Sequence, residues 1–135
     1  MKYSLEQIPE IAKQIASKNK KVLTFEGPLG AGKTTLIKEI LKHYNVLDDE
    51  VTSPTFTYLN IYLGSKKIYH FDLYRLEDLD DFIELGFDEY LQEPEAIVLI
   101  EWPEIIKSIL FDRLEMKLSH SNEGFREITM EEIDG

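Results

Sequence analysis

The sequence predicts an α/β fold, in which helices flank a mixed sheet that is parallel at its centre and carries antiparallel hairpins as additions. Three features indicate this fold: a strand, glycine loop and helix over 22–44, two β-branched and aromatic runs joined at 64–65, and the continuous apolar run 96–100. A run without polar alternation is typical of a strand covered on both faces, as in a parallel sheet. We expect one domain over 1–135, because 135 residues supply one core and too little chain for two.

The first half of the chain is predicted to form two helices with a strand between them. Apolar residues at helical spacing behind Ser4, a typical N-cap residue, predict a helix over 4–18. The apolar run 22–26 predicts the first strand, and a second helical pattern predicts a helix over 33–44. The two helical patterns consist of Ile8, Ile11, Ala12, Ile15 and Ala16, and of Leu36, Ile37, Ile40, Leu41 and Tyr44.

The second half begins with a predicted hairpin. The runs 55–63 and 67–74 are rich in β-branched and aromatic residues, and the Gly64-Ser65 pair between them is typical of a tight turn. The remaining elements are expected to be strands over 96–100, 113–119 and 125–130 and a short helix over 103–110.

A helix is also expected over 78–92, between the hairpin and the continuous apolar run. Its pattern places Phe82, Leu85 and Leu91 toward the core, and Gly86 is expected to bend it.

The most specific motif lies between the first predicted strand and the second predicted helix. It reads Gly27-Pro28-Leu29-Gly30-Ala31-Gly32-Lys33-Thr34 and matches G-x-x-x-x-G-K-[ST]. Glycines let successive backbone N–H groups turn toward an anion, and the helix adds the positive end of its dipole. Lys33 would reach the β- and γ-phosphates, and the Thr34 hydroxyl would ligate Mg²⁺. The motif therefore predicts a P-loop NTPase-like domain that binds a nucleoside triphosphate.

A P-loop also needs a carboxylate for magnesium, usually at the end of a neighbouring buried strand. Glu101 follows the apolar run 96–100, whereas Asp72 ends an alternating strand of the hairpin. A strand buried on both faces belongs beside the P-loop strand, and an alternating hairpin strand belongs toward an edge. We therefore interpret Glu101 as the magnesium carboxylate, bound directly or through water.

Asp72 has a setting that suggests a second catalytic group. The segment His70-Phe71-Asp72-Leu73-Tyr74-Arg75 gathers an acid, an imidazole, a phenol and a cation, and alternation places His70, Asp72 and Tyr74 on one face. Asp72 could orient the attacking water or bind the outer shell of the metal. His70 is better explained as a packed or hydrogen-bonded structural residue.

The segment Thr52-Ser53-Pro54-Thr55 lies between the P-loop helix and the hairpin, where nucleotide switches usually occur. A hydroxyl of Thr52, Ser53 or Thr55 could sense the γ-phosphate through magnesium. Ordinary turn chemistry explains the same residues equally well, because Ser-Pro favours a turn.

Composition restricts the partners and the compartment. The chain has no cysteine, 43% apolar residues and a formal net charge of -11. No apolar run approaches the ~18 residues that a membrane span needs, so we expect a cytoplasmic protein without a membrane partner. An acidic surface repels a polyphosphate backbone, so any contact with RNA is expected to run through a partner protein.

Four segments together resemble the TsaE (YjeE) family over roughly residues 3 to 130. These are Gly30-Ala31-Gly32-Lys33-Thr34-Thr35, Thr52-Ser53-Pro54-Thr55-Phe56-Thr57, His70-Phe71-Asp72-Leu73-Tyr74-Arg75-Leu76 and Leu99-Ile100-Glu101-Trp102-Pro103. Members of the family are bacterial ATPases required for threonylcarbamoyladenosine at position 37 of tRNAs that read codons beginning with adenine. They act with TsaB and TsaD: TsaD transfers the threonylcarbamoyl group, and TsaE, which alone hydrolyses ATP weakly, supports repeated turnover.

Carried over to this chain, the resemblance implies ATP and Mg²⁺ as cofactors and TsaB and TsaD as partners, with tRNA reached only through their complex. It implies magnesium at Thr34 and Glu101, and functional roles for Asp72 and Trp102. The implied nucleotide-binding residues are Leu29, Gly30, Ala31, Gly32, Lys33, Thr34 and Thr35. Pro28 departs from the family, which often has aspartate there, and Arg126 alone resembles the family's C-terminal part.

Three other functions are compatible with a P-loop. A small-molecule kinase usually clamps its phosphates with several arginines, and this chain has only Arg75, Arg113 and Arg126. A regulatory GTPase needs Asn-Lys-x-Asp near its end, whereas the sole Asn-Lys here is Asn19-Lys20, ahead of the P-loop. A nucleotide-dependent binding module without hydrolysis remains open, because a partner can supply the missing catalytic groups.

Overall fold

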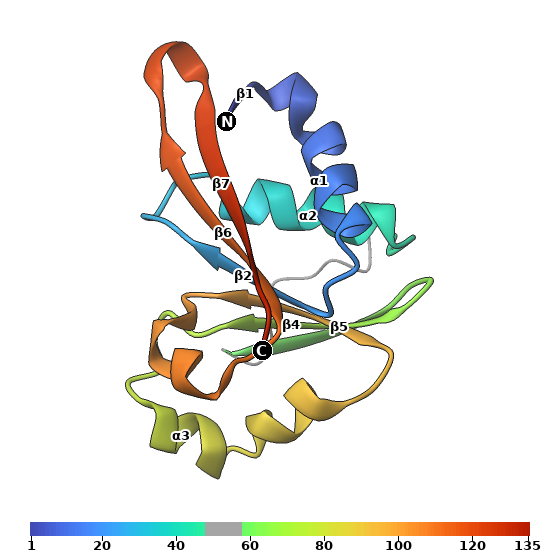
Figure 1. The fold of residues 1–135 in the computed structure, drawn as a ribbon, viewed down its shortest axis with the longest axis vertical. Coiled ribbons are helices and arrows are strands. Elements are labelled where there is room, and N and C mark those ends of the chain that lie inside the picture. The colour runs from blue at the N-terminus through green and yellow to red at the C-terminus, as the bar shows by residue number, and fades with distance from the viewer. Residues whose placement is uncertain (48–57) are drawn as a thin grey trace.

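The computed structural model describes residues 1–47 and 58–135, and a seven-stranded sheet runs through them in the order β1-β7-β6-β2-β5-β4-β3 (Figure 1). The strands are β1 (Lys2–Tyr3), β2 (Val22–Glu26), β3 (Leu59–Leu63), β4 (Lys67–Asp72), β5 (Ala96–Glu101), β6 (Arg113–His120) and β7 (Arg126–Ile133). The helices are α1 (Ile8–Ser17), α2 (Lys33–His43) and α3 (Leu79–Glu84), and the 3₁₀ helices are η1 (Leu5–Gln7), η3 (Phe87–Gln92), η4 (Pro103–Ile109) and η5 (Asn122–Gly124).

The sheet is parallel at its centre and antiparallel at its edges, which confirms the predicted fold class. β2 pairs in parallel with both β5 and β6, and β4 pairs in parallel with β5. β3 pairs antiparallel with β4, while β7 pairs antiparallel with β6 and with β1. The carboxyl ends of β2, β4 and β5 therefore meet at one edge, where Glu101 is paired with Phe25 on one side and with Asp72 on the other.

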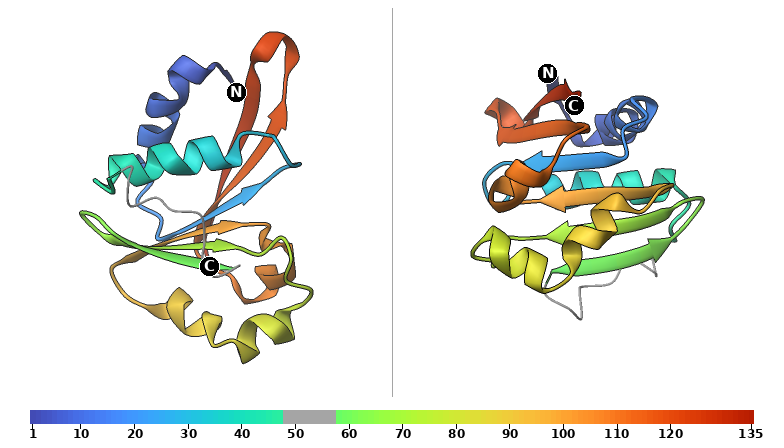
Figure 2. Two further views of the ribbon diagram at one scale, coloured as in Figure 1. Left: turned by 180° about the vertical axis from the view of Figure 1, so that it is seen from behind. Right: turned by 60° about the horizontal axis from the view of Figure 1, so that its bottom comes forward.

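Helices cover both faces of the sheet (Figures 1 and 2). α1 and α2 lie on one face, and α3, η3 and η4 lie on the other. All six residues of β5 are buried: Ile97 and Leu99 pack in the core between the sheet and α1–α2, and Val98 and Ile100 pack in the core between the sheet and α3. This confirms that a continuous apolar run is covered on both faces.

The N-terminal helix and the hairpin lie close to their predicted positions. The expected helix 4–18 begins as η1, where the Ser4 backbone N–H donates to Gln7 Oε1 at 2.8 Å, and continues as α1. The short strand β1 was not predicted, because two residues are too few to show a pattern. β4 lies one strand in from the edge and ends at Asp72, and residues 55–57 of the expected strand 55–63 lie outside the described residues.

The expected helix 78–92 is divided at Gly86, as its glycine suggested. Gly86 has φ +78° and separates α3 from η3. Phe82 is fully buried and Leu91 packs against the core, but the inward placement of Leu85 was wrong, because its side chain is 52% exposed. α3 ends at Glu84, so the helical periodicity that would turn Leu85 inward stops there.

Two further boundaries differ slightly from the sequence prediction. β7 extends to Ile133, three residues beyond the expected strand 125–130, because it pairs with the whole of β6. The expected helix 103–110 is the 3₁₀ helix η4. None of the helices in the described ranges is long and apolar enough to cross a membrane.

Phe82 is expected to anchor the α3 layer to the sheet. Its ring centroid lies 5.5 Å from that of Phe71 and 5.6 Å from that of Phe87. Phe82→Ala should lower the free energy of unfolding by about 3–5 kcal/mol, measured by denaturant titration, because it removes a fully buried ring. Leu85→Ala is the matched control and should change the stability by less than about 0.5 kcal/mol, since Leu85 is exposed. Equal losses in the two variants would contradict this packing.

Candidate functional site

The loop between β2 and α2 follows the carboxyl end of β2 and folds tightly against the sheet. The Ala31 N–H donates to the Pro28 carbonyl at 3.1 Å, and Gly32 caps α2 with φ +99°, a left-handed conformation that favours glycine. A Cβ atom on Gly27 would lie 2.4 Å from the Leu118 carbonyl oxygen, so only glycine fits there without a shift. The first turn of α2 carries no acidic residue, and its positive dipole end is therefore available to an anion.

Lys33, the first residue of α2, is held inside the site. Its side chain is 5% exposed, and its Nζ donates to the Gly27 carbonyl oxygen at 2.5 Å. The same Nζ lies 3.5 Å from the centroid of the Trp102 ring, which is a cation–π contact. Burial lowers the pKa of Lys33, while the nearby carboxylates of Glu101, Glu104 and Asp72 act in the opposite direction.

Glu101 is buried at the end of β5, with only 6% of its surface exposed. The Nε2 of His70 lies 2.8 Å from Glu101 Oε2, so His70 is hydrogen-bonded, as the sequence led us to expect. His70 and Asp72 come from β4, which pairs with β5. The imidazole of His70 therefore fixes one oxygen of the Glu101 carboxylate, which lies at the end of the strand beside β2.

Asp72 lies opposite Glu101 in the β4–β5 register and is half-buried. Burial raises the pKa of Asp72, and the nearby Glu101 carboxylate raises it further. The Tyr74 backbone N–H donates to Asp72 Oδ1 at 3.2 Å and partly offsets this effect. Two carboxylates thus face one edge of the sheet, and Lys33 is the cation beside them.

Trp102 is turned toward Lys33 by an unusual backbone conformation. Its φ of +57° and ψ of +59° place it in the left-handed region, which is costly for a bulky residue. Its backbone N–H donates to the Phe25 carbonyl at 3.3 Å, and its ring centroid lies 4.8 Å from that of Tyr74. The chain therefore bends directly after Glu101, and the indole covers the lysine of the P-loop.

A cavity of about 300 Å³ brings most of the predicted site residues together. Leu29, Gly30, Gly32, Lys33, Thr34 and Thr35 line one side, and Asp72, Tyr74, Glu101, Trp102 and Arg126 complete it. Ala31 does not line the cavity, because its side chain is fully buried beneath the loop. The predicted switch residues Thr52, Ser53 and Thr55 lie outside the described residues.

Two residues of the cavity were not predicted as site residues. Tyr74 was placed on the face of Asp72, but nothing in the sequence showed that its ring would meet Trp102. Arg126 comes from β7, and a Cβ atom on Gly32 would lie 3.3 Å from its Nε. Only a weak indication for Arg126 was present in the sequence. The antiparallel pairing of β6 and β7 brings this residue back to the loop between β2 and α2, almost a hundred residues earlier in the chain.

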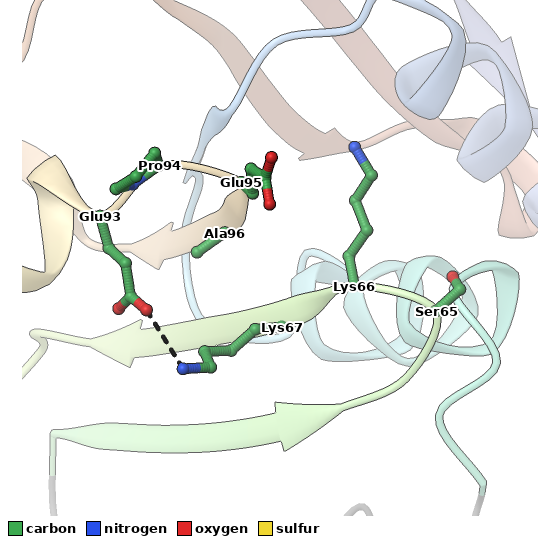
Figure 3. A pocket seen from close by; sticks show the side chains of 7 residues that line it. All are labelled: Ser65, Lys66, Lys67, Glu93, Pro94, Glu95 and Ala96. Atoms are coloured by element: carbon green, nitrogen blue, oxygen red, sulfur yellow. Dashed lines mark hydrogen bonds and ion pairs between the residues drawn. The ribbon is translucent and has the colours of Figure 1, made fainter.

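A larger cavity of about 590 Å³ lies at the turn between β3 and β4, away from these residues (Figure 3). Ser65, Lys66, Lys67, Glu93, Pro94, Glu95 and Ala96 line it. Lys67 Nζ lies 3.1 Å from Glu93 Oε1, and the Tyr69 hydroxyl also bonds to Glu93. Lys67 and Glu93 are thus paired with each other, and none of the predicted site residues lines this cavity.

The chain is similar to known proteins over most of its length. A model of the family described as "Threonylcarbamoyl adenosine biosynthesis protein TsaE" matches residues 3–128. The tRNA threonylcarbamoyladenosine biosynthesis protein TsaE of Rickettsia felis is 43% identical over 108 residues, which are 78% of this chain and 62% of that protein. The protein of the same name from Bacillus subtilis is 39% identical over 92% of this chain and 78% of its own length. The matched region thus spans under two thirds of the Rickettsia relative.

A solved structure agrees with these sequence matches. The crystal structure of YdiB from Bacillus subtilis superposes with a TM-score of 0.74 at 32% sequence identity, covering 100% of this chain and 86% of that one. The family match, the two relatives and the shared fold confirm the resemblance read from the four sequence segments. The chain therefore belongs to the TsaE family.

Proposed function

We propose that this chain is a magnesium-dependent P-loop ATPase that hydrolyses ATP weakly alone and acts with TsaB and TsaD in forming threonylcarbamoyladenosine at position 37 of tRNA. The observation that carries the proposal is the cavity that joins Lys33 and Thr34 of the loop to the carboxylates of β4 and β5. Backbone amides and a cation on one side and carboxylates on the other suit a triphosphate with its metal. Membership of the TsaE family supports the role in tRNA modification.

Lys33 is the group that would meet the phosphate charge. In the structure its amine is bound to an uncharged carbonyl and an aromatic face, both of which are weaker partners than a phosphate. Burial lowers the pKa of Lys33 because it makes the ammonium costly, and the carboxylates of Glu101, Glu104 and Asp72 offset this only in part. An anion would relieve that cost, so ATP should draw Lys33 away from Gly27 and Trp102.

Thr34 and Glu101 supply oxygen ligands of the kind that Mg²⁺ prefers. Within residues 1–47 and 58–135, no three His, Cys, Asp or Glu side chains gather into a metal site of their own, so phosphate oxygens would complete the shell. Bound Mg²⁺ would neutralise charge on the phosphates. His70 holds Glu101 Oε2 at 2.8 Å and thereby fixes which oxygen faces the site, as partners of metal-binding carboxylates commonly do.

Asp72 is the group that would orient the attacking water. Its raised pKa, caused mainly by burial, makes it a better proton acceptor than an ordinary aspartate while it is ionised. The bond from the Tyr74 N–H holds Oδ1 in place. Asp72 is thus proposed as the water-orienting group and Glu101 as the metal carboxylate.

The distribution of arginines favours a weak ATPase over a small-molecule kinase. Arg126 lines the cavity, but Arg113 is bound to Glu115 and to the carbonyls of Leu110 and Phe111. Arg75 is exposed and does not line the cavity. A single arginine at the site is fewer than a kinase uses to clamp moving phosphates.

Lys33→Ala should weaken ATP binding by about 10- to 100-fold, because a charge-assisted hydrogen bond contributes ~1.5–3 kcal/mol. The affinity is measured by calorimetric titration with ATP and Mg²⁺, and the fold is checked by thermal melting. Lys38→Ala, at an exposed position on the same helix, is the control and should leave the affinity unchanged. Unchanged affinity in Lys33→Ala would contradict the P-loop assignment.

Glu101→Gln should raise the magnesium concentration needed for half-maximal ATP binding by about tenfold or more. Mutation of even the outer partners of metal ligands typically lowers the affinity for the metal by ~10–100-fold. Asp72→Asn should shift that concentration far less while depressing hydrolysis. The measurement is ATP affinity across a magnesium titration for the two isosteric variants. A shift confined to Asp72→Asn would reverse the two roles.

The chain alone should not bind tRNA appreciably at physiological salt, because its formal net charge of -11 opposes a phosphate backbone.

In a reconstituted reaction with TsaB and TsaD, Asp72→Asn should depress tRNA modification and leave ATP binding nearly intact. Modification is counted under multiple-turnover conditions. A reaction that proceeds equally well without the chain would refute its proposed role.

A further inference from the structure

The layer formed by α3, η3 and the segment after η4 leaves an apolar hollow open to solvent. A cavity of about 420 Å³ lies between these elements, a volume within the ~300–1,000 Å³ typical of ligand pockets. Its apolar lining includes Leu91 and Ile109, together with Ile83 and Phe111, which have 43% and 65% of their surfaces exposed. We call this surface, defined by Ile83, Asp88, Leu91, Ile109 and Phe111, the α3 face.

The α3 face lies in the most acidic part of the chain. Residues 76–106 contain eleven acidic residues and no lysine or arginine. Seven of these acidic residues belong to the α3–η3 layer: Glu77, Asp78, Asp80, Asp81, Glu84, Asp88 and Glu89. None of the seven is within 4 Å of a cationic group among the described residues. Their mutual repulsion would be relieved by a cationic partner.

Two lysines lie at or near the cavity. Lys21 lines it and keeps its positive charge there, because its Nζ donates to the uncharged Leu91 carbonyl at 3.1 Å. Lys20 is paired with Asp112 and Asp134 at 2.5 and 2.7 Å. The seven carboxylates of the α3–η3 layer outnumber these two lysines, so the formal charge of that layer and of the α3 face together is negative.

The α3 face is remote from the proposed nucleotide site. Val22, which begins β2, lines its cavity, as do Leu110, Phe111 and Asp112, which immediately precede β6. The nucleotide cavity lies instead at the carboxyl ends of the central strands. The two cavities share no lining residue, so a molecule bound to the α3 face is not expected to compete with ATP.

We propose that the α3 face docks a protein segment that presents one or two large apolar side chains flanked by lysine or arginine. The apolar hollow supplies the area whose burial gives affinity, and the carboxylates of the α3–η3 layer beside it select a cationic segment and speed its association. The same carboxylates repel nucleic acid and anionic membranes. They also repel a second copy of this chain, which carries the same net charge of -11.

The test is a nuclear magnetic resonance titration of the ¹⁵N-labelled chain with a short amphipathic peptide that carries leucines on one face and lysines on the other. Amides of 79–92 and 109–112 should shift, and ATP affinity should not change. Two matched peptides, with serine for leucine or glutamate for lysine, should bind at least about tenfold more weakly. The same titration is repeated with tRNA and with anionic vesicles.

Variants of the chain then test whether the peptide binds the α3 face specifically or the acidic surface of the chain in general. Ile83→Ser with Phe111→Ser should weaken peptide binding by about tenfold, and Asp80→Asn with Glu84→Gln should flatten its salt dependence. Ile61→Ser with Leu63→Ser, at exposed apolar positions on β3, is the matched control and should bind as the wild type does.

Equal binding of the serine peptide, shifts spread over the whole acidic surface, or stronger binding of tRNA or vesicles at the same amides would overturn the proposal. Self-association through the α3 face, seen as concentration-dependent shifts of the same amides, would overturn it as well. Because the titration needs no nucleotide and no TsaB or TsaD, its failure leaves the proposed ATPase function standing, and failure of that function does not affect the titration.

Discussion

Burial of β5 on both faces is the constraint on which the rest of this structure depends. A strand of six buried residues must lie inside the sheet with helices above and below it. It takes that position between β2 and β4, and all three strands run in the same direction. Their carboxyl ends consequently place the P-loop, Glu101 and Asp72 together, although these groups are separated by up to about seventy residues along the chain.

The buried charges at this edge are held by neighbouring side chains and backbone groups. Lys33 is nearly excluded from solvent, yet its close partners are the Gly27 carbonyl and the Trp102 ring. The two carboxylates are held by His70 and by the Tyr74 N–H. The strained backbone of Trp102 places the indole over the lysine, so the chain maintains a conformation that costs energy at this site. The site is thus preorganised, with an aromatic cover where a phosphate group would bind.

Much of this arrangement could be predicted because it depends on local patterns. The P-loop motif, the hairpin and the continuous run 96–100 each have a local residue pattern that is typical of one backbone conformation. The choice of Glu101 as the residue beside the P-loop strand followed from burial alone, and the register places it opposite Phe25.

The features that escaped prediction depend on tertiary contacts. Arg126 reaches the site only because β7 folds back along β6, and Tyr74 meets Trp102 only because the chain turns left-handed after Glu101. Leu85 was placed inward by a helical period that ends one residue too early, at Glu84. Side-chain periodicity predicts which face a residue occupies, but it does not show where an element stops or which distant strand returns to it.

We propose two functional ends for the sheet, with nucleotide chemistry at the carboxyl ends of the strands and an acidic, apolar docking surface at the opposite ends. On this proposal, Lys33 exchanges its present partners for phosphate when ATP binds. A crystal structure of the chain with a non-hydrolysable ATP analogue and Mg²⁺ would show whether it does. Lys33 Nζ is expected to leave the Gly27 carbonyl and the Trp102 ring and to contact the terminal phosphates, with the metal bound beside Thr34 and Glu101. A triphosphate bound elsewhere, or Lys33 still held beneath Trp102 with nucleotide present, would contradict it.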